Sequence, residues 1–107
     1  MNPKIWGGYA WFFLHSVTLN YPDDPSSEDK QRMKDFFNSL KYVLPCNSCS
    51  KHLRSHIRNR PLTDRELSSR KKLIYWLIDI HNDVNKDTGK RAESYDSVMK
   101  SIESKYQ

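Results

Sequence analysis

Cys46 and Cys49 are the only cysteines in the chain, and two residues separate them. A disulfide between them would close so short a loop that it would remove little entropy from the unfolded chain. Such a C-x-x-C pair is more typical of a redox switch or of half a metal site. Pro45 directly precedes the pair, and a helix beginning here would stabilise a thiolate through its N–H groups and its dipole. The spacing therefore predicts thiol–disulfide chemistry.

Zinc binding is the main alternative, because His52 and His56 follow the two cysteines at helical spacing. All four side chains would lie on one short helix, which cannot readily surround a tetrahedral ion without a second segment. In this alternative, the chain would be a non-catalytic zinc-binding or interaction module. A thioredoxin-like domain is a weaker alternative, since no strand pattern precedes Cys46.

Two further groups of residues could hold a planar ligand. Trp11 and His15 are four residues apart and share a helix face, as do His81 and Asn85, one turn past Trp76. Each could instead be a packed aromatic side chain or a hydrogen-bonded core histidine. Taken together, they are suited to stacking a planar ring and hydrogen-bonding a nucleotide. Because no G-x-G-x-x-G sequence is present, a dinucleotide would have to be held between helices rather than in a Rossmann site.

The elements that would position these residues are helices. Apolar residues recur at three- and four-residue spacing along most of the chain, and no segment alternates with period two. We therefore expect an all-α protein, a four-helix bundle with a short fifth helix, in a single domain over residues 1–107. The expected helices cover about 8–21, 27–44, 45–60, 63–88 and 94–106.

Capping residues and prolines set the expected boundaries. Ser26 and Ser27 are candidate N-caps of the second helix, and Pro45 can occupy the first turn of the third. The sequence from Thr63 to Glu66 has the form of a capping box and predicts the start of the fourth helix. Gly89 is expected to end that helix.

Charge and hydropathy exclude some classes of protein. The chain has 18 Lys and Arg against 13 Asp and Glu, for a formal net charge of +5. The basic residues are spread from Lys4 to Lys105, so we expect a solvated basic surface rather than a nucleic-acid site. No apolar run approaches the roughly 20 residues of a membrane span, and the segment from Met1 to Leu14 does not have the composition of a signal peptide.

Several motifs in one order resemble the Erv/ALR family of FAD-linked sulfhydryl oxidases. C-x-x-C alone is a weak signal, but W-x-x-x-H upstream and H-N-x-V-N downstream of it make a specific combination. The resemblance spans about residues 7–90. It is carried by Gly7, Trp11-Phe-Phe-Leu-His15, Tyr21-Pro22, Pro45-Cys46-Asn-Ser-Cys49, Trp76, His81-Asn82-Asp-Val84-Asn85 and Gly89-Lys90.

The resemblance implies a helical bundle that binds FAD non-covalently and uses Cys46 and Cys49 as its catalytic pair. Cys49 would be the thiol next to the flavin, and Cys46 would exchange with a substrate dithiol. Electrons would pass from that dithiol through the pair and the flavin to O2, giving H2O2. The residues implied in cofactor binding are Gly7, Trp11, His15, Cys49, His81, Asn82, Val84, Asn85 and Lys90. Among them, Trp11, the two histidines and the two asparagines would hold the adenine and ribose, and Lys90 would lie near the phosphates or the ring system.

The partners implied are a dithiol protein or a thioredoxin-like redox protein, O2 as the acceptor, and a second copy of the chain in a homodimer. Many members of the family carry a second, shuttle cysteine pair, which this chain lacks. Either a further region supplies that pair, or a separate redox protein delivers electrons directly to Cys46. A minimal single domain of this kind, without a shuttle cysteine pair, resembles versions in large DNA viruses. This resemblance would place the protein in the cytoplasm of an infected cell or in the virion.

Overall fold

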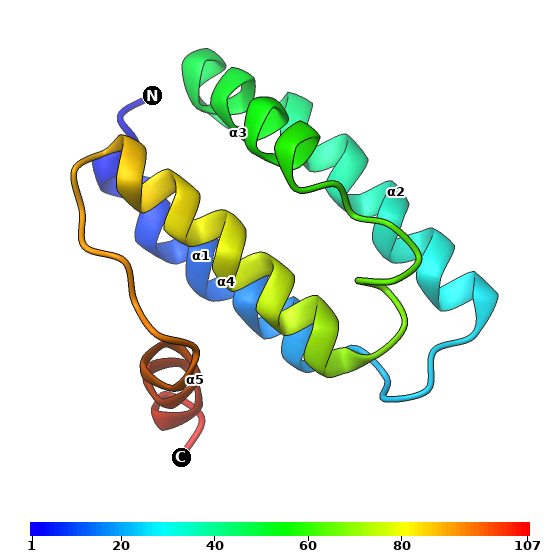
Figure 1. Ribbon diagram of the computed structural model, residues 1–107. Coiled ribbons are helices and arrows are strands. Elements are labelled where there is room, and N and C mark those ends of the chain that lie inside the picture. Colours follow the sequence, from blue (N-terminus) through cyan, green and yellow to red (C-terminus); the bar gives the residue numbers. More distant parts are fainter.

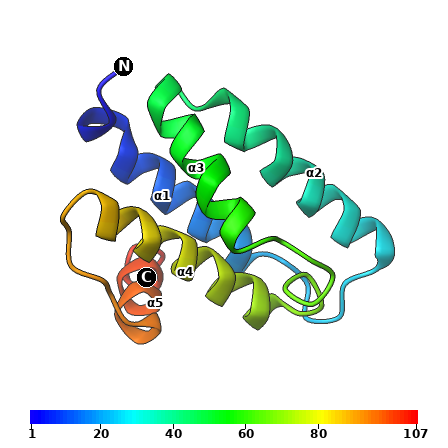
Figure 2. The ribbon, with the colours of Figure 1, turned by 45° about the horizontal axis from the view of Figure 1, so that its top comes forward.

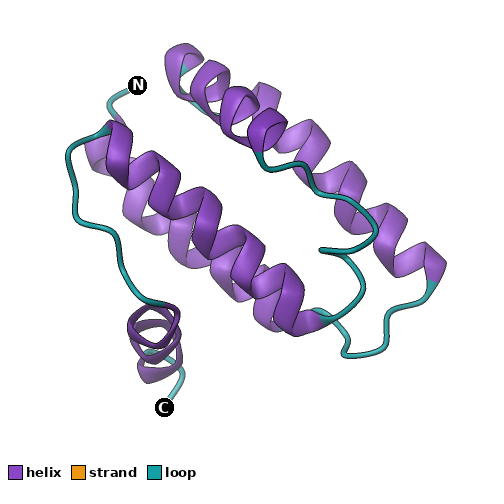
Figure 3. Cartoon of the chain, viewed as in Figure 1, coloured by secondary structure: helices purple, strands orange, loops and turns teal.

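The structure is a computed structural model that describes residues 1–107, and it contains five helices and no strands (Figures 1 and 3). The expectation of an all-α bundle with a short fifth helix is confirmed. The helices are α1 (Pro3–Leu19), α2 (Ser27–Val43), α3 (Asn47–Asn59), α4 (Arg70–Asp87) and α5 (Tyr95–Ser104). None of the five is both long and apolar enough to cross a membrane.

Side-chain caps explain where most of the helices begin. Ser26 caps α2, and its hydroxyl and the Asp29 carboxylate form a reciprocal capping box. Ser69 and Ser94 accept hydrogen bonds from the first turns of α4 and α5 in the same way. The prediction of Ser26 as an N-cap is confirmed, and Gly89, at φ 74°, follows the end of α4 as expected.

Three predicted boundaries are wrong. Helix α1 begins at Pro3 rather than near residue 8, because Asn2 caps it and Pro3 suits a first turn. Pro45 lies before α3 rather than inside its first turn, since Cys46 is the N-cap. The Thr63 hydroxyl donates to the Glu66 carboxylate itself, so the expected capping box forms only a turn, and α4 starts later, at Arg70.

The helices pack as two antiparallel pairs, α1 with α4 and α2 with α3, and α3 also contacts α4. A core of buried side chains joins these four helices and includes Phe37, Leu53 and Leu77. Figures 1 and 2 show that the end of α2, the start of α3, the start of α1 and the end of α4 lie at one end of the bundle. That end holds the cysteines.

Helix α4 is buried on two faces, which explains the place of α5. One face, with Leu73 and Leu77, joins the main core. The other face, with Ile74 and Ile78, packs against Val98 and other residues of α5 in a second apolar cluster. Helix α5 therefore lies beside α1 and α4 on the side away from α2 and α3 (Figure 1).

Candidate functional site

The two cysteines form a disulfide at the start of α3, with their Cα atoms 5.2 Å apart. Cys46 is the N-cap, and its sulfur accepts a hydrogen bond from the backbone N–H of Cys49 at 3.2 Å. The Ser48 hydroxyl lies 3.3 Å from the same sulfur. When the disulfide is reduced, these groups and the helix dipole favour the thiolate of Cys46.

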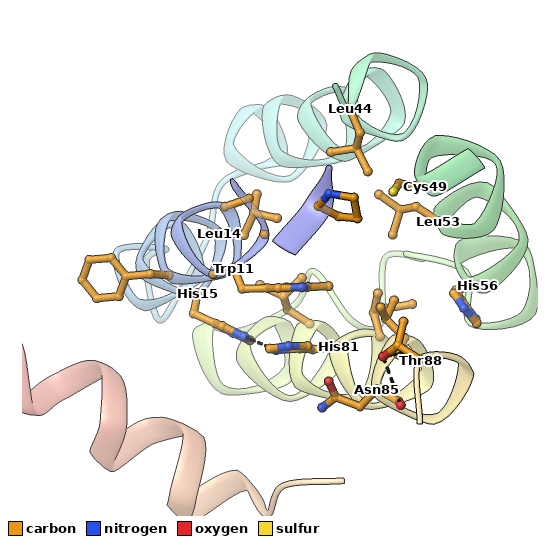
Figure 4. Close-up of a pocket in the computed structure, with 18 of the residues that line it drawn as sticks. Trp11, Leu14, His15, Leu44, Cys49, Leu53, His56, His81, Asn85 and Thr88 are labelled. Carbon is orange, nitrogen blue, oxygen red and sulfur yellow. Dashed lines mark hydrogen bonds between the residues drawn. The ribbon is translucent and has the colours of Figure 1, made fainter. Parts of the chain in front are cut away.

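A cavity of about 760 Å³ lies mainly between α1, α3 and α4, with further lining from α2 and α5. The two cysteines differ in their relation to this cavity. Cys49 is part of its lining, whereas Cys46 is not. In Figure 4, Cys49 and Leu53 of α3 face Trp11 and Leu14 of α1 across the cavity. Both residues are half-buried, and the disulfide connects a sulfur outside the cavity with a sulfur at the cavity wall.

Aromatic rings from α1 and α4 form the opposite wall. Trp11 stacks on His81 with ring centroids 3.8 Å apart and planes 6° from parallel. His15 Nε2 lies 2.9 Å from His81 Nδ1, so the two rings share one hydrogen bond (Figure 4). Burial lowers the pKa of both His15 and His81 to about 4, and the neighbouring His15 and Lys90 add to the effect on His81. Both rings are therefore neutral at pH 7.

Two asparagines on α4, Asn82 and Asn85, form hydrogen bonds at the edge of the cavity. Asn85 is buried and lines the cavity, and its Nδ2 donates to Oδ1 of Asn82 at 3.3 Å. Asn82 pairs with Glu93 through two hydrogen bonds of 2.9 Å, which hold the segment between α4 and α5 against α4. Within this segment, the Lys90 N–H donates to the Asn85 carbonyl at 2.7 Å, which places Lys90 at the cavity.

Eight of the nine residues expected at a cofactor line this one cavity. They are Gly7, Trp11, His15, Cys49, His81, Val84, Asn85 and Lys90. Asn82 is outside the lining, and its amide is used to hold Glu93.

Sequence reasoning missed Trp6, whose indole N–H is buried at the cavity without a hydrogen-bond partner. It was missed because the first helix was expected to start near residue 8. The sequence did contain a signal for Trp6. Asn2 as a cap and Pro3 in a first turn start the helix early enough to include Trp6, which directly precedes Gly7.

The arrangement of the histidines on α3 gives no support to zinc binding. His56 Nε2 lies 2.7 Å from a carboxylate oxygen of Asp87, and Cys46 and Cys49 are bonded to each other. No group of three or more His, Cys, Asp or Glu side chains is arranged to hold a metal ion. The four residues of the zinc alternative therefore do not converge on one point.

The family profile described as the Erv1/Alr family matches residues 9–106, which is nearly the whole chain. The chain belongs to the Erv1/Alr family. Its relatives include a probable FAD-linked sulfhydryl oxidase of Acanthamoeba polyphaga mimivirus, 50% identical over 96% of this chain and 72% of that protein. A putative FAD-linked sulfhydryl oxidase of Invertebrate iridescent virus 3 is 39% identical over 79% of this chain. The mitochondrial FAD-linked sulfhydryl oxidase ERV1 of Saccharomyces cerevisiae is 40% identical over 75% of it.

Solved structures of the Erv1/Alr family share the fold. The crystal structure of the yeast Erv1 core has a TM-score of 0.86 and 31% identity, covering 95% of this chain and 84% of that one. The FAD-binding domain of Erv1 from Saccharomyces cerevisiae has a TM-score of 0.83 and 33% identity, covering 90% and 89%. The matched part is 57% of the iridescent virus protein and 41% of the yeast protein, so these relatives contain regions outside the shared domain.

Proposed function

We propose that the chain is an FAD-linked sulfhydryl oxidase that makes disulfides in a dithiol substrate and passes the electrons to O2, giving H2O2. The disulfide carries this proposal, because it joins Cys46, which lies outside the cavity lining, to Cys49 at the wall of the cavity. An electron pair can enter at one sulfur and leave at the other. Membership of the Erv1/Alr family and the names of the relatives support the same activity.

The residues around the cavity fit FAD in size and in chemistry. A volume of about 760 Å³ lies within the range of about 300–1,000 Å³ that is usual for cofactor pockets. Trp11 and the paired histidines offer flat aromatic surfaces, and Lys90 offers a positive charge for phosphates. The unpartnered N–H of Trp6 is a buried donor, and such groups normally have an acceptor.

Gly7, Trp11, His15, His81, Val84, Asn85 and Lys90 would hold the cofactor, with Cys49 beside its redox-active ring. Asn82 would act indirectly, by fixing the segment that carries Lys90. When bound, FAD would supply the two-electron transfer from the reduced cysteines to O2, which is chemistry that protein side chains do not supply.

The protein's own part is thiol–disulfide exchange at Cys46. A substrate thiolate attacks the Cys46 sulfur, the Cys46–Cys49 bond breaks, and the electron pair stays on Cys49 as a thiolate. The second substrate thiol, after losing its proton, attacks the substrate sulfur of the mixed disulfide. This releases Cys46 as a thiolate and the substrate as a disulfide. The Ser48 hydroxyl and the Cys49 N–H can then hold the thiolate of Cys46.

A homodimer is part of the proposal, because α1 has an apolar stripe on its outer surface. Ile5, Tyr9 and Phe13 lie four residues apart, so they share one helix face, and their exposed fractions are 73%, 81% and 60%. Large apolar side chains exposed in a row are typical of a surface that another protein covers. A second copy of α1 offers the matching face in a symmetric dimer.

The test starts with the colour of the purified protein and its reaction with dithiothreitol. We expect flavin absorbance, O2 consumption, and one H2O2 for each disulfide formed. Colourless protein that cannot be loaded with FAD would contradict the proposal, and so would flavin-loaded protein that consumes no O2.

Single cysteine variants test the order of the two sulfurs. Cys49→Ser should bind FAD but lose turnover by several orders of magnitude. Cys46→Ser should also lose turnover, but it keeps a thiol beside the flavin, so a long-wavelength charge-transfer band is expected in its spectrum. If Cys49→Ser shows that band and Cys46→Ser does not, the roles of the two residues are reversed.

A further inference from the structure

Acidic residues are absent from a stretch of the chain that includes both cysteines. Residues 36–63 contain five Lys and Arg, at 41, 51, 54, 58 and 60, and no Asp or Glu. The other 13 basic residues lie outside this stretch together with all 13 acidic ones, so they cancel. The basic residues are spread along the sequence as expected, but the whole formal net charge of +5 belongs to the stretch with the disulfide.

The fold places this charge on the outside of α3 and the end of α2. Ser50, Leu53 and Ile57 face the core, while Cys49, His52 and His56 line the cavity. Lys51, Arg54 and Arg58 follow one another at three- and four-residue spacing on a third face, and Lys51 and Arg58 are exposed. We call these three residues the basic stripe. The basic stripe begins at Lys51, near the end of α3 that carries Cys46, and follows this helix. Figure 2 shows the course of α3.

No carboxylate neutralises the basic stripe. The ion pairs on neighbouring positions use other residues, His56 with Asp87 and Arg60 with Asp83. The Arg54 guanidinium lies 4.8 Å from the ring centroid of Tyr42 and donates to the Lys41 carbonyl. Tyr42 and its neighbour Val43 are 64% and 69% exposed, which adds an apolar surface where α2 ends.

We propose that the basic stripe, with Tyr42 beside it, docks an acidic segment next to the dithiol of the substrate. This rests on the proposed oxidase function and narrows its substrate to dithiol segments flanked by Asp and Glu. Carboxylates on the substrate gain from an uncompensated positive surface, and long-range attraction speeds encounter with Cys46.

A basic surface can attract nucleic acid as well as an acidic protein segment. The arrangement of the basic stripe favours the protein segment. The stripe is three residues on one short helix rather than a patch that could follow a phosphate backbone. It shares its helix with the disulfide, and the remainder of the chain has no net charge. A ligand held here would therefore lie close to Cys46.

Charge reversal of Lys51 and Arg58 tests the proposal, because neither side chain forms an ion pair. The probes are three synthetic peptides with one central C-x-x-C dithiol, flanked by Glu, by Gln or by Lys. The matched control is Lys71→Glu with Lys100→Glu, two exposed sites on α4 and α5 outside the cavity lining, which lowers the net charge by the same amount.

At low salt the parent protein should oxidise the Glu-flanked peptide with a kcat/KM about tenfold above that of the Gln-flanked peptide. Lys51→Glu with Arg58→Glu should remove this preference, and added salt should weaken it in the parent. The control variant should keep it. Dithiothreitol oxidation should stay within about twofold in all three proteins, since a small neutral thiol gains little from steering.

A second readout does not use the cofactor. In a Cys49→Ser background, Cys46 attacks peptides whose cysteine carries a thionitrobenzoate group, and the coloured leaving group reports the rate. The same charge preference should appear, and the same double reversal should abolish it.

Equal rates for the three peptides in a parent that oxidises dithiothreitol would overturn the docking proposal and leave the oxidase function standing. Loss of affinity for a DNA duplex in the double reversal, with no change toward the Glu-flanked peptide, would also overturn it. If the parent protein does not oxidise dithiothreitol, the oxidase function itself is contradicted.

Discussion

At the scale of single residues, Cys46 and Cys49 have different surroundings because α3 begins between them. The first turn of α3 directs the N–H of Cys49 and the hydroxyl of Ser48 at the sulfur of Cys46, and it leaves Cys49 on the cavity side. Two identical side chains three positions apart therefore acquire different environments. Their separate roles in the proposed electron path follow from this difference.

Ser48→Ala should reduce the reactivity of Cys46, because the hydroxyl is a donor to its sulfur. In a Cys49→Ser background, alkylation by iodoacetamide near pH 7 should slow by about two- to fivefold, as expected for loss of one modest hydrogen bond. The difference should vanish at a pH where the thiol is fully ionised. Ser55→Ala, at an exposed position on the same helix, should alkylate like the parent.

The histidine pair should make stability depend on pH. Its members are neutral in the folded protein down to a pH of about 4, whereas the ordinary histidine pKa is 6.5. Between these values the unfolded chain binds more protons, so the free energy of unfolding falls as the pH falls. From pH 7 to pH 5, we expect a loss of about 1–2 kcal/mol for buried His15 and a smaller loss for His81.

Urea denaturation at several pH values measures this loss, with His81→Asn as the comparison. The variant should show a shallower decrease than the parent between pH 7 and pH 5, and far-UV circular dichroism should confirm that it is folded at pH 7. The same decrease in both proteins would mean that His81 is not responsible.

At the scale of elements, hydrogen bonds from α4 decide where the segment before α5 lies. Asn82 makes both hydrogen bonds to Glu93, and the Asn85 carbonyl accepts from the N–H of Lys90. Gly89, at a positive φ, allows the chain to turn at the end of α4. Helix α4 thus shapes one wall of the cavity and also fixes its rim.

Asn82→Ala should loosen that rim while leaving the core unchanged. Three hydrogen bonds are lost, two with Glu93 and one from Asn85, so we expect a fall of about 1–3 kcal/mol in the free energy of unfolding. Amide hydrogen exchange within residues 88–94 should accelerate, and FAD affinity should fall even though Asn82 does not line the cavity. Asn38→Ala, at an exposed position on α2, is the control and should change none of these quantities.

At the scale of the whole molecule, the exposed apolar stripe of α1 and the basic stripe of α3 lie on different helices. One is suited to a second copy of the chain, and the other to a charged substrate. Because the two stripes lie on different helices, we expect a dimer through α1 to leave α3 available to a substrate.

Tyr9→Glu should convert the proposed dimer into monomers. In a symmetric contact, each copy would contribute one glutamate, and two unpaired charges would be buried there. Size-exclusion chromatography with light scattering measures the mass, and 12.7 kDa is expected for the variant. Tyr9→Phe keeps the apolar surface and should remain dimeric. A monomeric parent would refute the assignment of this surface.

By itself, the sequence determined the helical class, the bundle and the redox pair. Apolar spacing of three and four residues can be satisfied only by helices with buried faces, and serines such as Ser26 mark helix starts through local hydrogen bonds. The same local reasoning failed at Thr63 and Glu66, where the two side chains bond to each other instead of to the backbone.

Only the tertiary structure decided which residues meet. His15 and His81 are 66 positions apart, and no local pattern shows that their rings share a hydrogen bond. The same is true of Trp6 at the cavity and of the two faces of α4, whose Ile74 and Ile78 need α5 as a partner. Periodicity reports which side chains are buried, whereas the contacts between helices depend on how distant segments pack together.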